Sequence, residues 1–384
     1  MNICMMAYTY YDLDNRVRRY AETLVREGHT VSAIALFRGD EESEEYIEGV
    51  RVYRIQKRII NERSMFSYLY RVLKFFFLST IFVTKCHLKN PFDVIHVHSV
   101  PDFEVFAAII PKLQGCKIIL DIHDIVPEFF ASKFSKGKKS FFFQMLVSIE
   151  KFSAKFADHV IISNHIWEKT LLSRSVPKKK LTTILNFPNE RIFKEKQVHN
   201  TKNPKIILYP GTINWHQGLD IAVRAFNIIH NQHPDYEFHI YGGGSGEKSL
   251  RDLIKELNLE NKVIINSFVS IDKVAKLMAT SNIGIIPKRD DPFGGQAFST
   301  KSLEFMAVGI PVIISRTKID NFYFNNKVVK FFTPGDENDL ANRLCELIDN
   351  PITTEKQTMA AKDFVKNYQW YNNRHIYIDL LDNI

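Results

Sequence analysis

Residues 290–315, DDPFGGQAFSTKSLEFMAVGIPVIIS, place a glycine-rich polar loop in front of an apolar segment that carries a lysine and a glutamate. Lys301 lies within this stretch, and Lys288 and Arg289 come immediately before it. Gly294 and Gly295 allow a backbone to approach a ligand closely, and backbone N–H groups at a helix start bind anions. The combination predicts a seat for a diphosphate group.

The same stretch predicts a helix that carries a second kind of ligand group. Ser299 or Thr300 is placed to cap this helix. Glu304 follows within an apolar sequence, which is a poor position for a charge that faces solvent. We therefore expect Glu304 to accept hydrogen bonds from a polyhydroxylated ligand, for which ribose is the natural candidate.

Three further polar loops follow strand-like runs. LDIHDIVPE contains His123 and Asp124, and an imidazole there can donate to a sugar hydroxyl or phosphate, or exchange a proton near neutral pH. The alternative is a histidine that only bonds to a neighbouring loop. In GTINWHQG, Gly211 and Gly218 bracket a turn whose N–H groups could face an anion, although such turns need glycine anyway. GGGSG, residues 242–246, is interpreted as a plain turn.

Histidine and cysteine spacing argues against a bound metal. His96 and His98 alternate with apolar residues, and no third ligand follows at suitable spacing, so we expect structural histidines. The four cysteines lie far apart without Cys-x-x-Cys spacing, which indicates neither a zinc site nor disulfides and fits a reducing cytoplasm. We expect no metal and no other cofactor.

The elements that must position these residues form two domains, as 384 residues of 45% hydrophobic composition suggest. Short apolar runs alternate with amphipathic stretches, which is typical of an α/β fold with doubly wound parallel sheets. The runs are NICMMAY, TVSAIALF, DVIHVHS, KIILDIHD, HVIIS, LTTILN, KIILYPG, EFHIYGG, KVIINSF, IGIIP and PVIIS. We place a first domain at 1–188, a charged linker at 189–204, a second domain at 205–367 and a closing helix at 368–384. Ligands of such sheets bind at the carboxyl ends of strands, so facing domains would enclose a cleft.

A net charge of +8 favours an anionic partner. Residues 70–89 and 132–156 mix lysines with phenylalanines at helical spacing, which is the composition of a helix that lies on an anionic membrane surface. The apolar run 75–83 is too short to span a bilayer. Core-facing helices with lysines that reach back to solvent are an equally weighted alternative. Nucleic acid is not expected, because no zinc, recognition-helix or RNA-binding signature accompanies the charge.

Nearly the whole chain resembles the GT-B nucleotide-sugar glycosyltransferases of the large retaining group called family four. The similar segments are DNRVRRYAETLVREGHTV, DVIHVHS, LDIHD, IISN, ILNFPN, YPGTINWHQGLDIAVRAF and FSTKSLEFMAVGIPVI. The resemblance implies two Rossmann-like domains that face each other across a cleft, with the acceptor bound by the first and the donor by the second. It also implies transfer without a required metal.

Site residues follow from the resemblance, with departures. His123 matches a histidine that faces the transferred sugar, and Glu304 matches the second carboxylate of a paired-glutamate motif, the one that holds ribose. Gln296 falls where the first glutamate belongs, and a glutamine can bond a hydroxyl but cannot offset a developing positive charge. Thr212 and Gln217 stand where the family commonly has an arginine and a lysine.

The diphosphate is then expected to meet Lys301 together with Lys288 or Arg289. Asn15 and Arg16 replace a glycine-rich first loop that many relatives carry, and with Asp124 they are expected on the acceptor side.

The implied activity is transfer of a sugar, with retention of anomeric configuration, from a nucleotide sugar. Uridine is the expected base, and the acceptor is a hydroxyl of a glycan or of a lipid-linked oligosaccharide at the inner face of the cell membrane. A noncatalytic subunit that binds sugar nucleotides or glycans is one alternative, motivated by Gln296, Thr212 and Gln217. A GT-B epimerase is another, but it needs more ionisable groups near the sugar than His123 and the nearby aspartates.

Overall fold

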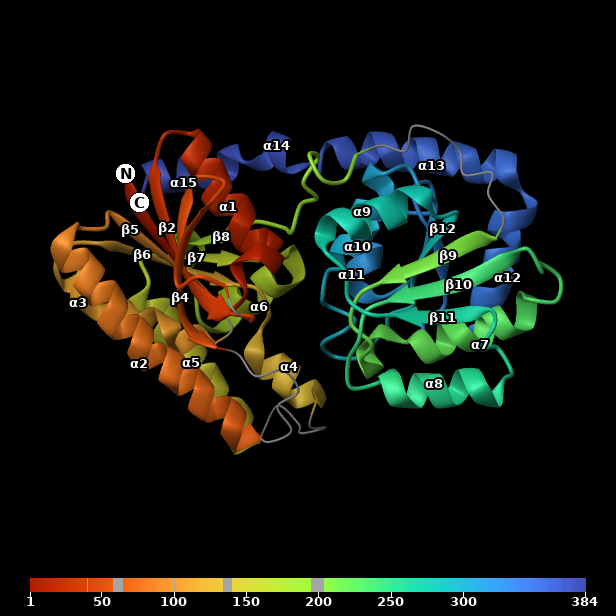
Figure 1. Ribbon diagram of the computed structural model, residues 1–384, viewed down its shortest axis with the longest axis horizontal. Coiled ribbons are helices and arrows are strands. Elements are labelled where there is room, and N and C mark those ends of the chain that lie inside the picture. The colour runs from red at the N-terminus through yellow and green to blue at the C-terminus, as the bar shows by residue number, and fades with distance from the viewer. Residues whose placement is uncertain (40, 58–64, 100, 134–139, 195–203) are drawn as a thin grey trace. The chain divides into compact units, whose positions relative to one another are not determined.

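The computed structural model describes residues 1–39, 41–57, 65–99, 101–133, 140–194 and 204–384, and the chain divides into two compact units (Figure 1). The first unit comprises Met1–Asn186 and Arg374–Ile384, and the second comprises Phe187–Asn373. The end of the chain therefore returns to the first unit, whereas the sequence pattern predicts a separate closing helix at 368–384.

The first unit is built on an eight-stranded sheet in the order β3-β4-β2-β1-β5-β6-β7-β8. Its strands are β1 (Asn2–Ala7), β2 (Thr30–Phe37), β3 (Glu44–Ile47), β4 (Val50–Lys57), β5 (Val94–His98), β6 (Lys117–Ile122), β7 (His159–Ile162) and β8 (Leu181–Thr183). All neighbouring strands are parallel except β3 and β4, which form an antiparallel pair.

Helices connect the parallel strands of the first unit, and a last helix joins this unit from the end of the chain. They are α1 (Asn15–Arg26), α2 (Met65–Lys89), α3 (Ile109–Leu113), α4 (Val126–Lys133), α5 (Phe141–Phe156), α6 (His165–Arg174) and α15 (His375–Asp382), with 3-10 turns η1 (Tyr11–Leu13), η2 (Asp102–Ala108) and η3 (Lys178–Lys180). Helix α1 begins where the Asp14 carboxylate accepts hydrogen bonds from the N–H groups of Arg16 and Val17. This cap fixes the start of α1 in the connection that follows β1 and η1.

The second unit has an all-parallel six-stranded sheet in the order β11-β10-β9-β12-β13-β14. Its strands are β9 (Lys205–Pro210), β10 (Tyr236–Tyr241), β11 (Val263–Asn266), β12 (Ile283–Ile286), β13 (Val312–Ser315) and β14 (Lys330–Phe332). Its helices are η4 (Trp215–Gln217), α7 (Leu219–Ile229), α8 (Glu247–Glu256), α9 (Ile271–Thr280), α10 (Thr300–Ala307), α11 (Lys318–Tyr323), α12 (Glu337–Asp349), α13 (Pro351–Lys366) and α14 (Trp370–Asn373). The expected α/β fold with two doubly wound sheets is confirmed.

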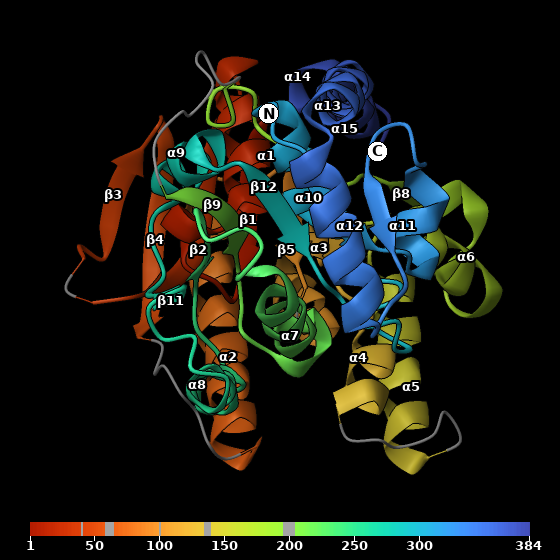
Figure 2. The same ribbon diagram turned by 90° about the vertical axis from the view of Figure 1, so that its right-hand side faces the viewer.

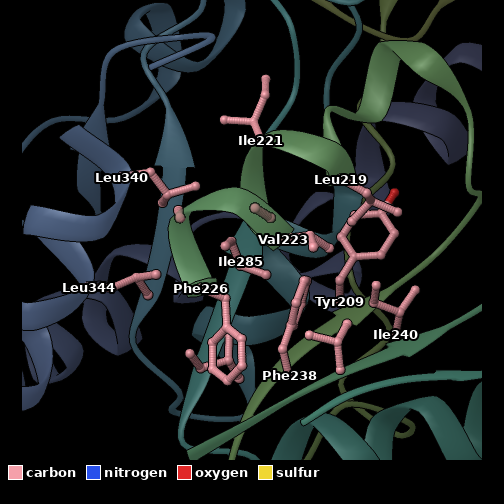
Figure 3. Close-up of a cluster of buried hydrophobic side chains, with 14 of the residues drawn as sticks. Tyr209, Leu219, Ile221, Val223, Phe226, Phe238, Ile240, Ile285, Leu340 and Leu344 are labelled. Atoms are coloured by element: carbon pink, nitrogen blue, oxygen red, sulfur yellow. The ribbon is translucent and has the colours of Figure 1, made fainter. Parts of the chain in front are cut away.

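Apolar side chains cover both faces of the second sheet, which explains why its strands are apolar almost throughout. On one face Phe226 of α7 and Leu344 of α12 pack with Phe238 and Ile285 of the strands (Figure 3). On the other face the core includes α10 and α13. The strand order reverses direction between β9 and β12, so the loops after these two strands diverge where such sheets bind ligands.

Three parts of the fold differ from the sequence-based expectation. Strands β3, β4 and β14 were missed, because β4 alternates buried residues with more exposed ones next to the edge strand β3, and β14 is only three residues long. The predicted closing helix is two short helices, α14 and α15. Phe193 of the predicted linker is buried in the second unit's core, whereas residues 195–203 of that linker lie outside the described residues.

The lysine- and phenylalanine-rich segments are partly core and partly surface. On α2, Phe75 is fully buried while Phe77 is 62% exposed. On α5, Phe143 is buried while Phe141 and Phe142 are 77% and 44% exposed. The basic residues at 134–139 of the second segment lie outside the described residues. Each helix therefore has phenylalanines that face the core and phenylalanines that are exposed, so neither the core-facing nor the membrane-surface interpretation describes all of them.

The amino-terminal ends of α2 and α5 reach the same lower end of the first unit in both views (Figures 1 and 2). Tyr68, Leu69 and Tyr70 are exposed at this end of α2, as Phe141 and Phe142 are at that of α5. Within the described ranges, no helix has both the length and the apolar character that crossing a bilayer demands.

Candidate functional site

The loops after β9 and β12 interlock at the carboxyl edge of the second sheet. Gly218 has a left-handed backbone (φ +63°), and a Cβ atom there would lie 2.0 Å from the carbonyl oxygen of Pro287. The N–H of Arg289 donates to the carbonyl of His216 over 2.9 Å, and Nδ1 of His216 lies 2.9 Å from Oδ2 of Asp291. Only glycine permits this approach at residue 218.

Lys301, in the first turn of α10, reaches across to the loop after β9. Its ammonium lies over the ring of Tyr209 at 5.4 Å, and a Cβ on Gly211 would lie 2.5 Å from its Cε. Burial lowers the pKa of Lys301, although the Glu304 carboxylate acts in the opposite direction. The structure thus brings Lys301, Gly211 and Glu304 together around the end of β9.

The amino end of α10 lacks the cap that the sequence predicts. Ser299 occupies the cap position, but its side chain makes no capping hydrogen bond, and its buried Oγ has no partner. Glu304 lies one turn after Lys301 and is 9% exposed. The start of α10 therefore offers backbone N–H groups that its own cap residue leaves available.

Lys288 and Arg289 are held by carboxylates of the second unit. Nζ of Lys288, which is 3% exposed, lies 2.8 Å from Oδ2 of Asp320 and donates to the Ala297 carbonyl. The Arg289 guanidinium donates to both carboxylate oxygens of Asp220, over 2.9 and 2.7 Å, and lies over the Trp215 ring. Both cations shape the loops, and of the three predicted cations Lys301 is the one placed at Gly211.

Thr212, Gln217 and Gln296, which were predicted for this site, make hydrogen bonds within the second unit. The Tyr209 hydroxyl donates to the Thr212 carbonyl over 3.0 Å and lies 2.9 Å from Oε1 of Gln217. Gln296 is half-buried, and its side-chain amide donates to the Pro292 carbonyl over 3.2 Å. Tyr209 was not predicted as a site residue. Its hydroxyl group near the end of an otherwise apolar strand is the sequence feature that could have identified it.

A hollow of about 300 Å³ lies between the amino ends of α7 and α8. Its lining includes Asn214, Trp215, Asp220, Ser245 and Ser249. The carbonyl of Ile213 accepts a hydrogen bond from the Gly246 N–H, so the loop after β10 is tied to the loop after β9. The glycine-rich turn at 242–246 is therefore also shaped by close approach, since a Cβ on Gly242 would lie 1.8 Å from the Gly211 carbonyl oxygen.

In the first unit, a buried ion pair joins the start of α1 to the end of β6. The Arg16 guanidinium donates to both oxygens of Asp121, over 2.7 and 2.8 Å, and the two residues are 4% and 0% exposed. Arg16 also donates to the carbonyl of Ile184 and to the side chain of Asn186, beyond β8. Burial would raise the pKa of Asp121, but the charges of Arg16 and His123 hold it well below its usual range.

Three histidines surround Asp121. Nδ1 of His98 and Nε2 of His123 lie 3.3 and 3.4 Å from Oδ2 of Asp121 and 3.2 Å from each other. Nδ1 of His96 lies 2.7 Å from the hydroxyl of Tyr377 in α15. Burial lowers the pKa of both His96 and His98. The His123 side chain remains 21% exposed.

The sequence spacing indicated no third metal ligand near His96 and His98, but the fold brings one close to them. Asp121 on the neighbouring strand completes a cluster whose possible ligand atoms lie within 4.8 Å of one another. Because both oxygens of Asp121 are bonded to the Arg16 guanidinium, however, a cation would have to displace a buried positive charge. The arrangement favours the expected structural role of these two histidines.

The other residues predicted on the acceptor side lie near this cluster in the chain. Asn15 is half-buried at the first position of α1. Asp124 follows His123 directly, and burial raises its pKa. Arg16 was predicted on the acceptor side, and its guanidinium donates hydrogen bonds to Asp121, Ile184 and Asn186 inside the first unit.

We predict that Arg16→Met destabilises the first unit by about 3–5 kcal/mol, because the change leaves the buried Asp121 carboxylate without its counter-charge. Chemical denaturation followed by circular dichroism measures the effect. Arg38→Met is the control, since Arg38 pairs with Asp12 but its side chain is 49% exposed, and it should cost about 0–1 kcal/mol. Equal losses in the two variants would contradict a structural role for the Arg16–Asp121 pair.

Comparison with known proteins agrees with this architecture. Residues 13–190 match the family model "Glycosyltransferase Family 4", and residues 190–364 match "Glycosyl transferases group 1". An uncharacterized glycosyltransferase of Methanocaldococcus jannaschii is 26% identical over 309 residues, which are 77% of this chain and 74% of that protein. The gpi3 subunit of a phosphatidylinositol N-acetylglucosaminyltransferase from Schizosaccharomyces pombe is 22% identical over 93% of this chain and 74% of its own length.

Among solved structures, Anabaena HepE in complex with UDP and glucose has the same fold. It superposes with a TM-score of 0.77 at 15% identity, covering 100% of both chains. The two family models adjoin at residue 190 and together extend from 13 to 364. The chain therefore belongs to the family-four type of GT-B glycosyltransferases.

Proposed function

We propose that this protein transfers a sugar from a uridine diphosphate sugar to a hydroxyl group of a glycan or lipid-linked acceptor, with retention of anomeric configuration. The observation that carries the proposal is the position of Lys301 at the uncapped start of α10, next to Gly211 and one turn before Glu304. A lysine, a close backbone and free helix N–H groups together suit a diphosphate.

The nucleotide is assigned to the second unit. Lys301 and the N–H groups of α10 neutralise the diphosphate, and Glu304 accepts hydrogen bonds from the ribose hydroxyls. Thr212 and Gln217 replace the cations common in the family, and Gln217 is already bonded to Tyr209. Lys301 therefore carries most of the charge stabilisation here. The HepE structure that contains UDP and glucose supports a uridine nucleotide for a chain of this fold.

In the proposed reaction, the bond between the sugar C1 and the diphosphate oxygen breaks, and the acceptor oxygen forms its bond to C1 on the same face. The departing phosphate oxygen takes the acceptor proton, so no protein nucleophile is needed. Charge builds on the leaving diphosphate, which is where Lys301 acts. No divalent ion is required in this scheme.

His123 and Gln296 are proposed to hold the transferred sugar. Nε2 of His123 faces His98 and Asp121, which fixes the ring and leaves its other nitrogen for a sugar hydroxyl. The Gln296 amide bonds a hydroxyl but adds no negative charge near C1. Asn15 and Asp124 are proposed on the acceptor side.

A lipid-linked acceptor would place the first unit at a membrane surface. Tyr68, Leu69 and Tyr70 on α2 and Phe141 and Phe142 on α5 expose apolar side chains at one end of this unit. Exposed lysines, including Lys74 on α2 and Lys151 on α5, lie on the same helices. Apolar insertion combined with attraction to anionic headgroups suits an interfacial contact.

The activity is tested by screening nucleotide sugars for a rise in melting temperature, which a ligand of the native state produces by mass action. The stabilising donor is then incubated with hydroxyl acceptors and UDP release is followed, with EDTA present, below the unfolding temperature. We expect release, and a product with the donor's anomeric configuration by NMR. A donor that binds without any release to acceptors or water would instead support the noncatalytic subunit.

Lys301→Ala should weaken UDP binding by about 1.5–3 kcal/mol, or roughly 10- to 150-fold, because a charge-assisted hydrogen bond to the diphosphate is lost. Isothermal titration calorimetry measures this change. Lys330→Ala is the matched control: Lys330 begins β14, at the opposite edge of the sheet, and pairs with Glu346. If both variants bind UDP like the parent chain, Lys301 does not contact the diphosphate.

Liposome flotation should recover the protein with anionic vesicles, and recovery should fall as salt rises, because each basic residue near the surface contributes about 1 kcal/mol. Phe141→Ser combined with Phe142→Ser should reduce recovery. The control pair is Ile352→Ser with Met359→Ser, which removes two exposed apolar side chains from α13 of the second unit. Equal recovery of the protein in the unbound fraction with anionic and with neutral lipid would exclude this surface and favour a soluble acceptor.

A further inference from the structure

A second cluster of metal-ligating side chains lies in the second unit, outside the site residues discussed so far. His233 lies in the turn between α7 and β10, and Cys345 and Asp349 lie on α12. The possible ligand atoms of these three residues all lie within 4.8 Å of one another, and Nε2 of His233 is 3.9 Å from Oδ1 of Asp349.

The packing of α12 on α7 holds the cluster together. Leu340 and Leu344 of α12 pack in one buried core with Phe226 of α7 (Figure 3). Leu347 and Ile229 belong to the same core, and Cys345 packs against it. Cys345 and Asp349 are four residues apart, so they lie one above the other on a single face of the helix. The backbones that carry the three side chains are therefore fixed before any ion binds.

The three side chains suit a zinc-like ion. A thiolate and an imidazole favour Zn²⁺ over Mg²⁺ or Ca²⁺, which prefer oxygen ligands. Tetrahedral zinc places such ligand atoms about 3.4–3.6 Å apart, given its bond lengths to sulfur, nitrogen and oxygen. The 3.9 Å between Nε2 of His233 and Oδ1 of Asp349 exceeds this range by about 0.3–0.5 Å. The Asp349 side chain is 59% exposed, so little packing opposes its movement toward an ion.

The charges around this cluster differ from those around His96, His98 and Asp121. There, both carboxylate oxygens are bonded to a buried arginine. Asp349, in contrast, makes no ion pair with a lysine or arginine in the part of the chain that is described, and its contact is with His233. A cation entering here displaces no existing positive charge.

We propose that His233, Cys345 and Asp349 bind one zinc-class divalent ion, with a fourth position open to solvent. Strand β10 begins just after His233, so this ion lies at the amino edge of the sheet, opposite the loops that follow the strand ends. It joins the turn before β10 to α12 and stabilises the second unit. The proposal is independent of the proposed transfer activity.

The test uses the purified full chain without a histidine tag, stripped with EDTA and then titrated with Zn²⁺ in calorimetry. Titration with Co²⁺ adds a readout of the ligand type, because a thiolate bound to cobalt gives a near-ultraviolet absorption band. We expect one zinc equivalent, a sulfur-to-cobalt band, and a rise in melting temperature. At free zinc of 100 times Kd, the unfolding equilibrium constant should fall about 100-fold.

Cys345→Ser should abolish the cobalt band, and Asp349→Asn, at an exposed helix end, should weaken zinc binding at least tenfold while the chain stays folded. The matched controls are Cys86→Ser, which removes the other half-buried cysteine, and His230→Gln, which changes the neighbouring histidine outside the cluster. Both should keep the band. A chain that binds no zinc, a band that survives Cys345→Ser, or a band lost in Cys86→Ser would overturn the site.

Discussion

The buried pair of Arg16 and Asp121 organises the carboxyl edge of the first sheet. One guanidinium, carried by the first turn of α1, bonds the end of β6 and the chain beyond β8, so three separate segments share a single charged group. The carboxylate it holds in turn orients His98 and His123. Removing either charge would leave the other buried and unpaired, which is why the arrangement depends on both.

The second unit also has ion pairs that hold the loops at the carboxyl edge of its sheet. Lys288 with Asp320 and Arg289 with Asp220 fix the loop after β12, and Gly218 lets that loop touch the start of α7. Lys288 and Arg289 therefore serve the loops, and of the three cations predicted to meet a diphosphate, Lys301 is the one that lies at Gly211. A chain that lacks the family's usual arginine and lysine in the preceding loop thus retains one cation at the corresponding strand end.

The two edges of the second sheet carry different kinds of site. The carboxyl edge carries glycines that allow close backbone approach, the uncapped α10 and the hollow beside Trp215, which are features suited to a ligand. The amino edge carries the His233, Cys345 and Asp349 cluster, whose helices are locked by the core. A metal there would stabilise the second unit without taking part in the proposed transfer reaction, which relies on positioning and on stabilisation of the leaving group.

The sequence by itself determined the parallel sheets, because strands buried on both faces must be apolar throughout, and it located the polar loops that follow them. It also singled out Lys301, Glu304 and His123 by residue type and place. Only the tertiary structure decided which cations are already paired, since Asp320 and Asp220 approach Lys288 and Arg289 from distant parts of the chain. The same holds for Asp121 beside His98, because neighbouring parallel strands bring together residues whose sequence separation carries no signal of contact.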